Sequence, residues 1–174
     1  MRCVAVRHLP TRLNREGILQ GRLDEPILEP DPETRRAIAS NGELLARLGP
    51  FDAVFASTLR RTQQTAEAYG YRPDIDPLLD ELDFGPYEGQ PREQLLREVP
   101  EWTSRPESVE LGESIAELEE RVRRFLERHA SLERVLIFGH GAWLRALRAL
   151  ALQGDIHSMN TTVLRNNTLL ELEL

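Results

Sequence analysis

The side chains that could carry chemistry in this sequence are two histidines and two arginines, each following a short apolar run. His8 comes directly after Arg7, His140 lies between two glycines, and Arg61 follows a third run by a few residues. A neutral imidazole can attack phosphorus and form a phosphohistidine. An arginine can hold two phosphate oxygens through parallel charge-assisted hydrogen bonds. These residue types predict a site for a phosphoryl group.

Such a site would divide the displacement of a phosphate ester into two steps. The arginines and the second histidine would meet the charge on the equatorial oxygens. The first leaving group is an alkoxide, so a nearby carboxylic acid would protonate it and then deprotonate the attacking water.

Three predicted strands must bring these side chains together. Residues 2–6 (RCVAV), 51–56 (FDAVFA) and 134–138 (RVLIF) are short and apolar, as expected of buried strands. Helices are predicted between them, so the fold class is α/β: three layers, α/β/α, around a mostly parallel central sheet. Ligands of such sheets lie beyond the carboxyl ends of the strands, where the histidines and arginines are expected.

Caps and breakers set the expected limits of the remaining elements. One helix should begin at Asp31-Pro32 and end at Gly49, and Ser114 should open another in a capping box with Glu117. The other expectations are a long functional loop over 9–32, a helix capped by Ser57 or Thr58 and ending near 68, an edge strand or loop over 72–79, helices over 92–99 and 141–152, and strands over 161–164 and 168–174.

Composition narrows the class of protein. A chain of 174 residues predicts one domain over residues 1–174. All 22 cationic side chains are arginine, which excludes Schiff-base lysine chemistry and a P-loop, and the single Cys3 excludes a multi-cysteine zinc cage. With a net charge of −7 and no targeting or membrane-spanning segment in the sequence, we expect a cytoplasmic protein that binds neither nucleic acid nor membrane.

Six motifs in order resemble the histidine phosphatase (phosphoglycerate mutase-like) family along nearly the whole chain. They are Arg7-His8 with Thr11 and Asn14, then G-I-L-Q-G-R-L-D-E-P over 17–26, S-T-L-R-R-T-Q-Q-T-A over 57–66, E-L-D-F-G-P-Y-E-G over 81–89, Gly112-Glu113-Ser114, and Gly139-His140-Gly141 with Leu144-Arg145.

The resemblance implies roles for individual residues. It implies His8 as nucleophile and Glu81 as proton donor and then acceptor, with no metal and no cofactor. It also implies that Arg7, Arg61 and His140 clamp the phosphoryl group, and that Asn14, Gln20, Gly21 and Gly141 contact phosphate or substrate. One departure is Leu9-Pro10 where the family has Gly-Glu, which could reshape the pocket.

The function we expect is hydrolysis of small phosphorylated metabolites through a phosphohistidine, with α-ribazole phosphatase as one candidate. Two alternatives remain open: a cofactor-dependent phosphoglycerate mutase, and a non-catalytic phospholigand-binding module. The mutases resemble this chain but carry an insertion after the motif at 81–89 that shields the intermediate from water, and this chain is short there. Its last strands could support a homodimer, so both monomer and homodimer are left open.

Several other residues have ordinary structural interpretations. Arg60 and Arg145 are expected to be exposed or ion-paired, His129 to lie at a helix end, and Trp143 to pack in the core. Glu88 could bond a backbone amide, His157 is expected in a polar loop, and Trp102 could form the floor of a substrate pocket.

Overall fold

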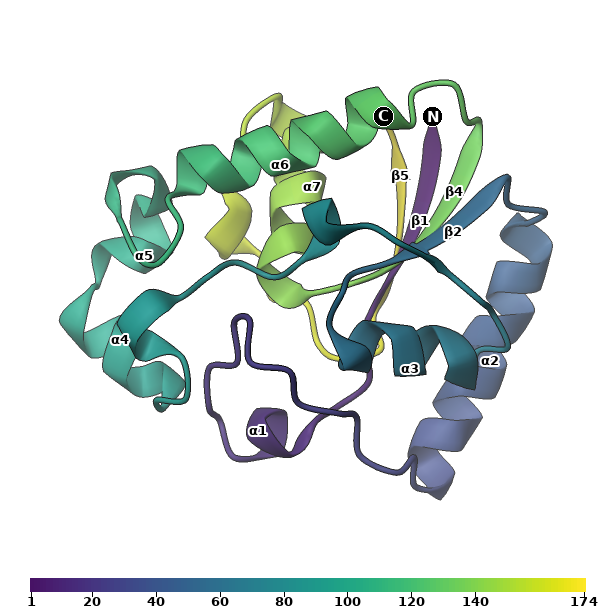
Figure 1. Cartoon of the computed structure of the whole chain (residues 1–174), viewed down its shortest axis with the longest axis horizontal. Coiled ribbons are helices and arrows are strands. Elements are labelled where there is room, and N and C mark those ends of the chain that lie inside the picture. Colours follow the sequence, from purple (N-terminus) through teal and green to yellow (C-terminus); the bar gives the residue numbers. More distant parts are fainter.

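The computed structural model describes residues 1–174 and is built on a five-stranded sheet of order β3-β2-β4-β1-β5 (Figure 1). Strands β1, β4, β2 and β3 are parallel, and β5 pairs antiparallel with β1. The predicted mostly parallel sheet is therefore confirmed. The strands are β1 (Arg2–Arg7), β2 (Ala53–Ala56), β3 (Asp74–Ile75), β4 (Arg134–Gly139) and β5 (Leu169–Glu173).

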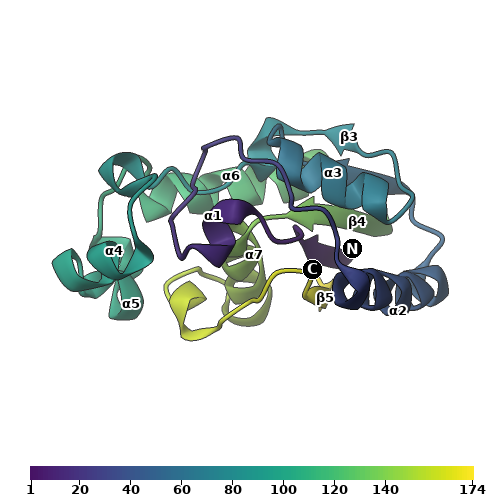
Figure 2. The ribbon, with the colours of Figure 1, turned by 90° about the horizontal axis from the view of Figure 1, so that it is seen from below.

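Helices cover both faces of this sheet, which gives the expected three layers. Helices α2 and α3 pack on one face and α6 and α7 on the other (Figure 2). Two short helices, α4 and α5, lie to the side of the sheet, at the end of the molecule away from α2 (Figure 1). The helices are α1 (Arg12–Arg15), α2 (Pro32–Leu48), α3 (Arg60–Ala68), α4 (Arg92–Glu98), α5 (Glu101–Ser104), α6 (Ile115–Arg128) and α7 (Gly141–Gln153).

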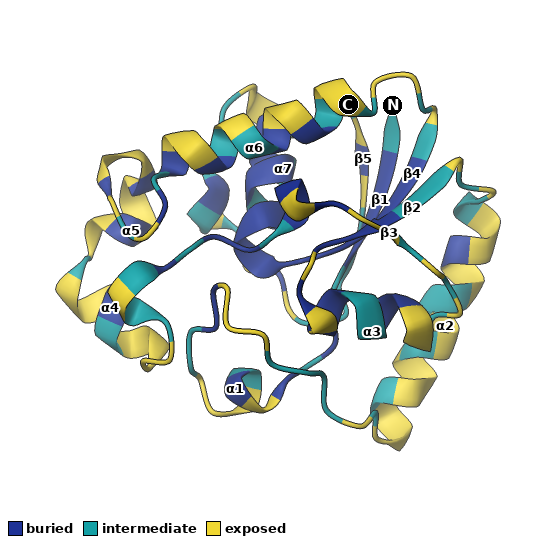
Figure 3. Cartoon of the chain, viewed as in Figure 1, coloured by how far each residue is buried: buried dark blue, intermediate teal, exposed yellow.

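The continuous apolar runs of the central strands follow from burial on both faces. In β1, Cys3 and Ala5 belong to the core under α6 and α7, whereas Val4 and Val6 belong to the core under α2 and α3. Figure 3 shows how the helices on the two faces differ in burial: α7 is mostly buried, whereas α2 exposes much of its surface. No helix is long and apolar enough to cross a membrane.

Predicted caps lie at both ends of α2, at the start of α6 and at the end of α7. The Asp31 side chain accepts from the backbone N–H of Thr34, and Ser114 and Glu117 form the expected capping box. The C-cap of α2 is Gly49, as expected. Residue Gly154 ends α7 with a φ of 84°, a left-handed conformation that glycine adopts without strain.

Two predicted features are wrong. Residues 161–164 form no strand, because Met159–Thr161 is a 3₁₀ turn and the Leu164 carbonyl accepts a hydrogen bond from the Arg7 guanidinium instead of a sheet partner. Neither Ser57 nor Thr58 is the N-cap of α3, which is Leu59. The expected loop over 9–32 also contains the one-turn helix α1, capped by Thr11.

Candidate active site

The carboxyl ends of the central strands bring the predicted histidines together. Strand β1 leads into His8, whose backbone N–H still donates to the Gly139 carbonyl at 2.9 Å, and β4 leads into His140. The two imidazole rings meet edge to face with centroids 5.4 Å apart. Parallel strands that end in register therefore place both histidines at one edge, as predicted.

Beyond this edge lies a cleft of ≈ 380 Å³. Its walls come from the loop after β1, the segment around Glu81, α4 and α5, the start of α7 and residues 160–166. Eight of the nine predicted site residues line it: Arg7, His8, Asn14, Gln20, Gly21, Arg61, Glu81 and Gly141. The ninth, His140, is fully buried and is not part of the cleft wall.

The hydrogen bonding of His8 determines which ring nitrogen is free to react. Its Nδ1 lies 2.7 Å from the carbonyl oxygen of Leu9, so Nδ1 carries the proton and donates. Nitrogen Nε2 then holds the lone pair. Burial, followed by the charges of Arg61 and Arg7, holds the pKa of His8 well below its usual value, so the imidazole is neutral at pH 7.

The leucine that follows His8 leaves the cleft unobstructed. Leu9 is fully buried, does not line the cleft, and its backbone N–H donates to Thr65 Oγ1 at 2.9 Å. Its side chain points into the protein, so it fixes the backbone that holds the His8 ring without occupying the space for a substrate.

Arg61 is held by backbone and by His140. Its two terminal nitrogens donate to the carbonyls of Leu23 and Gly21, each at 2.6 Å. Its Nε donates to His140 Nδ1 at 3.2 Å. Burial lowers the pKa of Arg61 to about 10, which still leaves it charged at pH 7.

Glu81 sits at the amino end of α7. Its Oε2 accepts from the N–H of Ala142 at 3.0 Å, and its Oε1 accepts from Trp143 at 3.1 Å and from Leu82 at 3.0 Å. The first backbone N–H groups of a helix have no partner within the helix, and the two carboxyl oxygens of Glu81 satisfy two of them. The start of α7 therefore fixes Glu81 in the cleft with His8 and the arginines.

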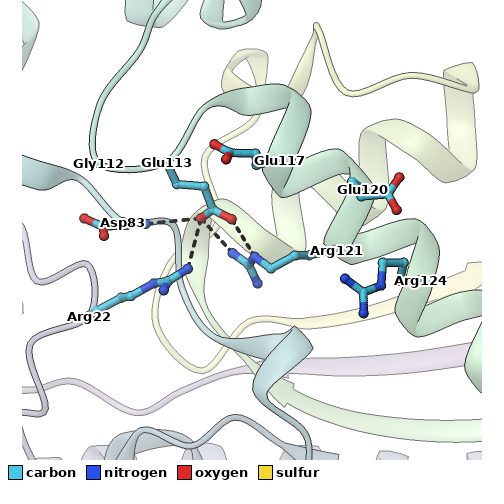
Figure 4. Close-up of a pocket in the computed structure, with 8 residues that line it drawn as sticks. All are labelled: Arg22, Asp83, Gly112, Glu113, Glu117, Glu120, Arg121 and Arg124. Carbon is cyan, nitrogen blue, oxygen red and sulfur yellow. Dashed lines mark hydrogen bonds and ion pairs between the residues drawn. The ribbon is translucent and has the colours of Figure 1, made fainter.

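The chain before Glu81 is secured by a buried ion pair, shown in Figure 4. The Glu113 carboxylate accepts hydrogen bonds from Arg121 at 2.5 and 2.9 Å and from Arg22 at 3.4 Å. This ion pair lies beside a shallow hollow outside the cleft. Arg121 also donates to the carbonyls of Leu78 and Asp80, at 2.8 and 3.0 Å. The motif at 112–114 thus supports the segment that carries Glu81.

The loop after β1 forms a polar network on the other wall. Thr11 donates to Gln20 Oε1 at 2.8 Å, and Asn14 Oδ1 accepts from the Thr11 N–H at 3.1 Å. Asn166 donates to this same Asn14 oxygen at 3.2 Å and to the His8 carbonyl at 2.9 Å. These bonds fix the predicted contact residues Asn14 and Gln20 in the cleft that also holds His8.

Glycine is required at position 21 for two reasons. Gly21 has a φ of 50°, and a Cβ there would lie 1.9 Å from Glu88 Oε1. That oxygen accepts from the backbone N–H groups of Arg22 and Phe84, so the expectation of a backbone role for Glu88 is confirmed.

The expectation for Arg145 is wrong. It is partly buried in the cleft wall, has no acidic partner, and donates to Asn160 Oδ1 at 3.1 Å. The signal was present in the sequence, because Arg145 follows Gly141 by four residues and so lies on the same helix face. Arg92 and Arg165, which also line the cleft, lie in segments without such a pattern.

The other single-residue expectations are mostly confirmed. Arg60 pairs with Asp24 at 2.9 Å, and His129 is the C-cap of α6. Trp143 is fully buried, and His157 is exposed outside the cleft. Trp102 lines the cleft as expected of a pocket floor and packs edge to face on Phe84.

The fold and the histidine-arginine cleft define an α/β protein built to hold a phosphoryl group. A family model of the histidine phosphatase superfamily (branch 1) matches residues 3–174, and the chain belongs to this superfamily.

Two similar proteins are named for different reactions, one for a phosphatase and one for a mutase. "Putative phosphoserine phosphatase 2" of Hydrogenobacter thermophilus is 33% identical over 158 residues, covering 84% of this chain and 76% of the relative. "Probable phosphoglycerate mutase GpmB" of Enterobacter sp. (strain 638) is 31% identical over 174 residues, covering 92% and 79%.

Solved structures share the fold. TTHB049 from Thermus thermophilus matches with a TM-score of 0.77 and 31% identity, over 99% of this chain and 93% of that one. The α-ribazole phosphatase from Shigella flexneri matches with a TM-score of 0.80 over 100% and 91%, and its 24% identity supports the fold alone.

Proposed function

We propose that the protein hydrolyses phosphomonoesters of small metabolites through a phosphohistidine at His8. The observation that carries the proposal is the hydrogen bond from His8 Nδ1 to the Leu9 carbonyl. This bond leaves the lone pair on Nε2, and His8 lines the same cleft as Arg7 and Arg61. A neutral, oriented imidazole beside two guanidinium groups is what nucleophilic attack on a phosphate dianion requires.

The first step forms a bond between His8 Nε2 and phosphorus and breaks the bond to the ester oxygen. Arg7 and Arg61 hold the phosphoryl oxygens, and Glu81 gives its proton to the departing alkoxide. In the second step Glu81 takes a proton from water, the hydroxide attacks phosphorus, and His8 leaves with its lone pair restored. The products are an alcohol and inorganic phosphate.

Labelling tests the proposal directly. Brief incubation with a ³²P-labelled phosphomonoester and rapid quenching should yield an acid-labile, base-stable label on the protein. The His8→Ala variant should lose both label and turnover, while His157→Ala, a histidine exposed outside the cleft, should keep both. A His8→Ala protein that still turns over substrate contradicts the mechanism. Vanadate should inhibit, and EDTA should have no effect.

Mutase activity is the second candidate, because one relative is named as a mutase. The fate of the phosphoryl group separates the two. With 3-phosphoglycerate as substrate, ³¹P NMR should show inorganic phosphate accumulating. Accumulation of the 2-phospho isomer without inorganic phosphate would favour the mutase.

A further inference from the structure

The charge of the cleft exceeds what one phosphoryl group needs. Five arginines line it, and the only acidic side chain there is Glu81. None of the five has a carboxylate within ion-pairing distance, although elsewhere in the chain arginines pair repeatedly with Asp and Glu. The formal excess is therefore four positive charges, and a phosphate dianion balances two. The arginines are Arg7, Arg61, Arg92, Arg145 and Arg165.

Arg145 stands next to the predicted phosphate ligand Arg7. A Cβ added at Gly141 would lie 3.3 Å from Arg7 Cζ and 3.4 Å from Arg145 Nη1, so both guanidinium groups pack against this one glycine. Both also have a buried Nε without a hydrogen-bond partner. Two adjacent guanidinium groups with unpaired buried donors are costly to maintain unless an anion binds them.

The environment of Arg145 supports the same conclusion. Burial lowers its pKa to about 10, and the charges of Arg7 and Arg92 contribute to the shift. The polar neighbour that orients it is neutral, since Nη2 donates to Asn160 Oδ1. Arg92 on α4 and Arg165 before β5 are both exposed, and both line the same cleft as Arg145.

We propose that Arg145, together with Arg92 and Arg165, forms a second anion subsite, so that the substrate is a phosphomonoester bearing a second anionic group. The inference rests on the proposed function and narrows its substrate class. Because Arg145 and Arg7 flank the same glycine, the second anion lies a short chain away from the phosphate. A carboxylate and a second phosphate share the required chemistry.

Matched substrates test the subsite. D-3-phosphoglycerate and glycerol 3-phosphate differ by a carboxylate in place of a hydroxymethyl group, and fructose 1,6-bisphosphate and fructose 6-phosphate differ by a phosphate. The charged member of at least one pair should have a kcat/KM about tenfold higher or more, as expected when a charged hydrogen bond is added. The pair that shows the preference identifies carboxylate or phosphate as the source.

Variants assign the preference to residues. Arg145→Gln should reduce the kcat/KM ratio of the charged to the uncharged substrate by about 10- to 100-fold. Arg92→Gln and Arg165→Gln, at exposed positions where folding is not at risk, should each reduce it about two- to fivefold. Arg97→Gln, which removes an exposed charge from α4 outside the cleft, should leave the ratio unchanged.

Failures of the two proposals can be told apart. If phenyl phosphate is hydrolysed but neither charged substrate is preferred, the subsite is refuted and the hydrolase stands. If Arg145→Gln slows both members of a pair equally, Arg145 serves the phosphoryl group and the subsite is likewise refuted. If no ester is hydrolysed, calorimetric titration of His8→Ala with each pair decides: tighter binding of a charged member supports the subsite, and equal binding refutes it.

Discussion

Arg61 and His140, both expected to hold phosphate, are bonded to each other through Arg61 Nε and His140 Nδ1 at 3.2 Å. Because Nδ1 accepts this bond, the proton of the neutral imidazole is on Nε2, which donates to Ser57 Oγ at 2.7 Å. Both nitrogens of His140 are thus engaged by protein. From this geometry we expect His140 to act as a positioning residue that orients Arg61.

Removing the Ser57 hydroxyl should test this arrangement. Ser57→Ala leaves a buried imidazole donor unpaired, so the free energy of unfolding should fall by about 1–3 kcal/mol. It should also raise KM for phosphomonoesters, because Arg61 loses its oriented partner. Urea unfolding and steady-state kinetics measure both effects. Ser108→Ala, at an exposed hydroxyl, is the matched control, and an unchanged KM in Ser57→Ala would contradict the positioning role.

Glu81→Gln should separate proton transfer from attack. The amide cannot protonate an alkoxide, so turnover of alkyl phosphates should fall by about 10²- to 10⁴-fold. p-Nitrophenyl phosphate should be slowed far less, because its leaving group needs little protonation. Rates on both substrates give the comparison, and equal slowing would remove Glu81 from the role of acid.

The lowered pKa values of His8 and His140 predict a pH dependence of stability. Both residues stay neutral in the folded state, whereas in the unfolded chain they take up protons as pH falls below about 6.5. Their stabilising effect is thus present above that pH and lost below it, by about 1.4 kcal/mol each between pH 7.5 and 5.5. Urea titrations at the two pH values measure the loss.

A variant isolates the histidine contribution to that loss. His140→Gln removes one titrating group, so its stability should fall less between the same two pH values than that of the wild-type protein. An identical pH dependence would show that His140 does not remain neutral in the folded state. The acid limb of kcat/KM should likewise lie below the ordinary histidine range, because the proposed nucleophile His8 reacts in its neutral form.

Gly141→Ala should weaken substrate binding without unfolding the protein. The added methyl group would lie 3.3–3.4 Å from the guanidinium groups of Arg7 and Arg145 and displace them by tenths of an ångström. We expect kcat/KM to fall about tenfold, since small displacements of positioning groups are costly. In Gly42→Ala, nothing lies within 4 Å of the new methyl group, so this control should stabilise α2 by roughly 0.5–1 kcal/mol and keep activity. Full activity in Gly141→Ala would contradict the close packing.

Glu113→Gln should destabilise the segment that carries Glu81. The change leaves Arg121 without its buried partner, which costs about 3–5 kcal/mol. Glu120→Gln, at an exposed side chain beside the same hollow, should stay within about 0.5 kcal/mol of wild type. Chemical denaturation compares them, and equal stabilities would show that the ion pair is not supporting the fold.

The sequence alone was sufficient to predict the α/β class, the three central strands and the side chains at their ends. Buried parallel strands require continuous apolar runs. The chain places His8 and His140 directly after two of these runs, and Arg61 a few residues after the third. The caps at Asp31 and Ser114 were equally predictable from the sequence, because a cap side chain accepts from a backbone N–H only three residues away.

Tertiary structure decided what depends on distant partners. Residues 161–164 have strand-like composition, but the Leu164 carbonyl is taken by Arg7, 157 residues earlier. The sequence alone suggests that Arg145 is a surface arginine. In the folded chain, the start of α7 forms part of the cleft wall and places Arg145 there. For His140, the motifs predict a contact with phosphate, and the tertiary structure bonds its two ring nitrogens to Arg61 and Ser57. Local bonding determines elements, whereas the protonation and accessibility of a side chain depend on everything that folding brings around it.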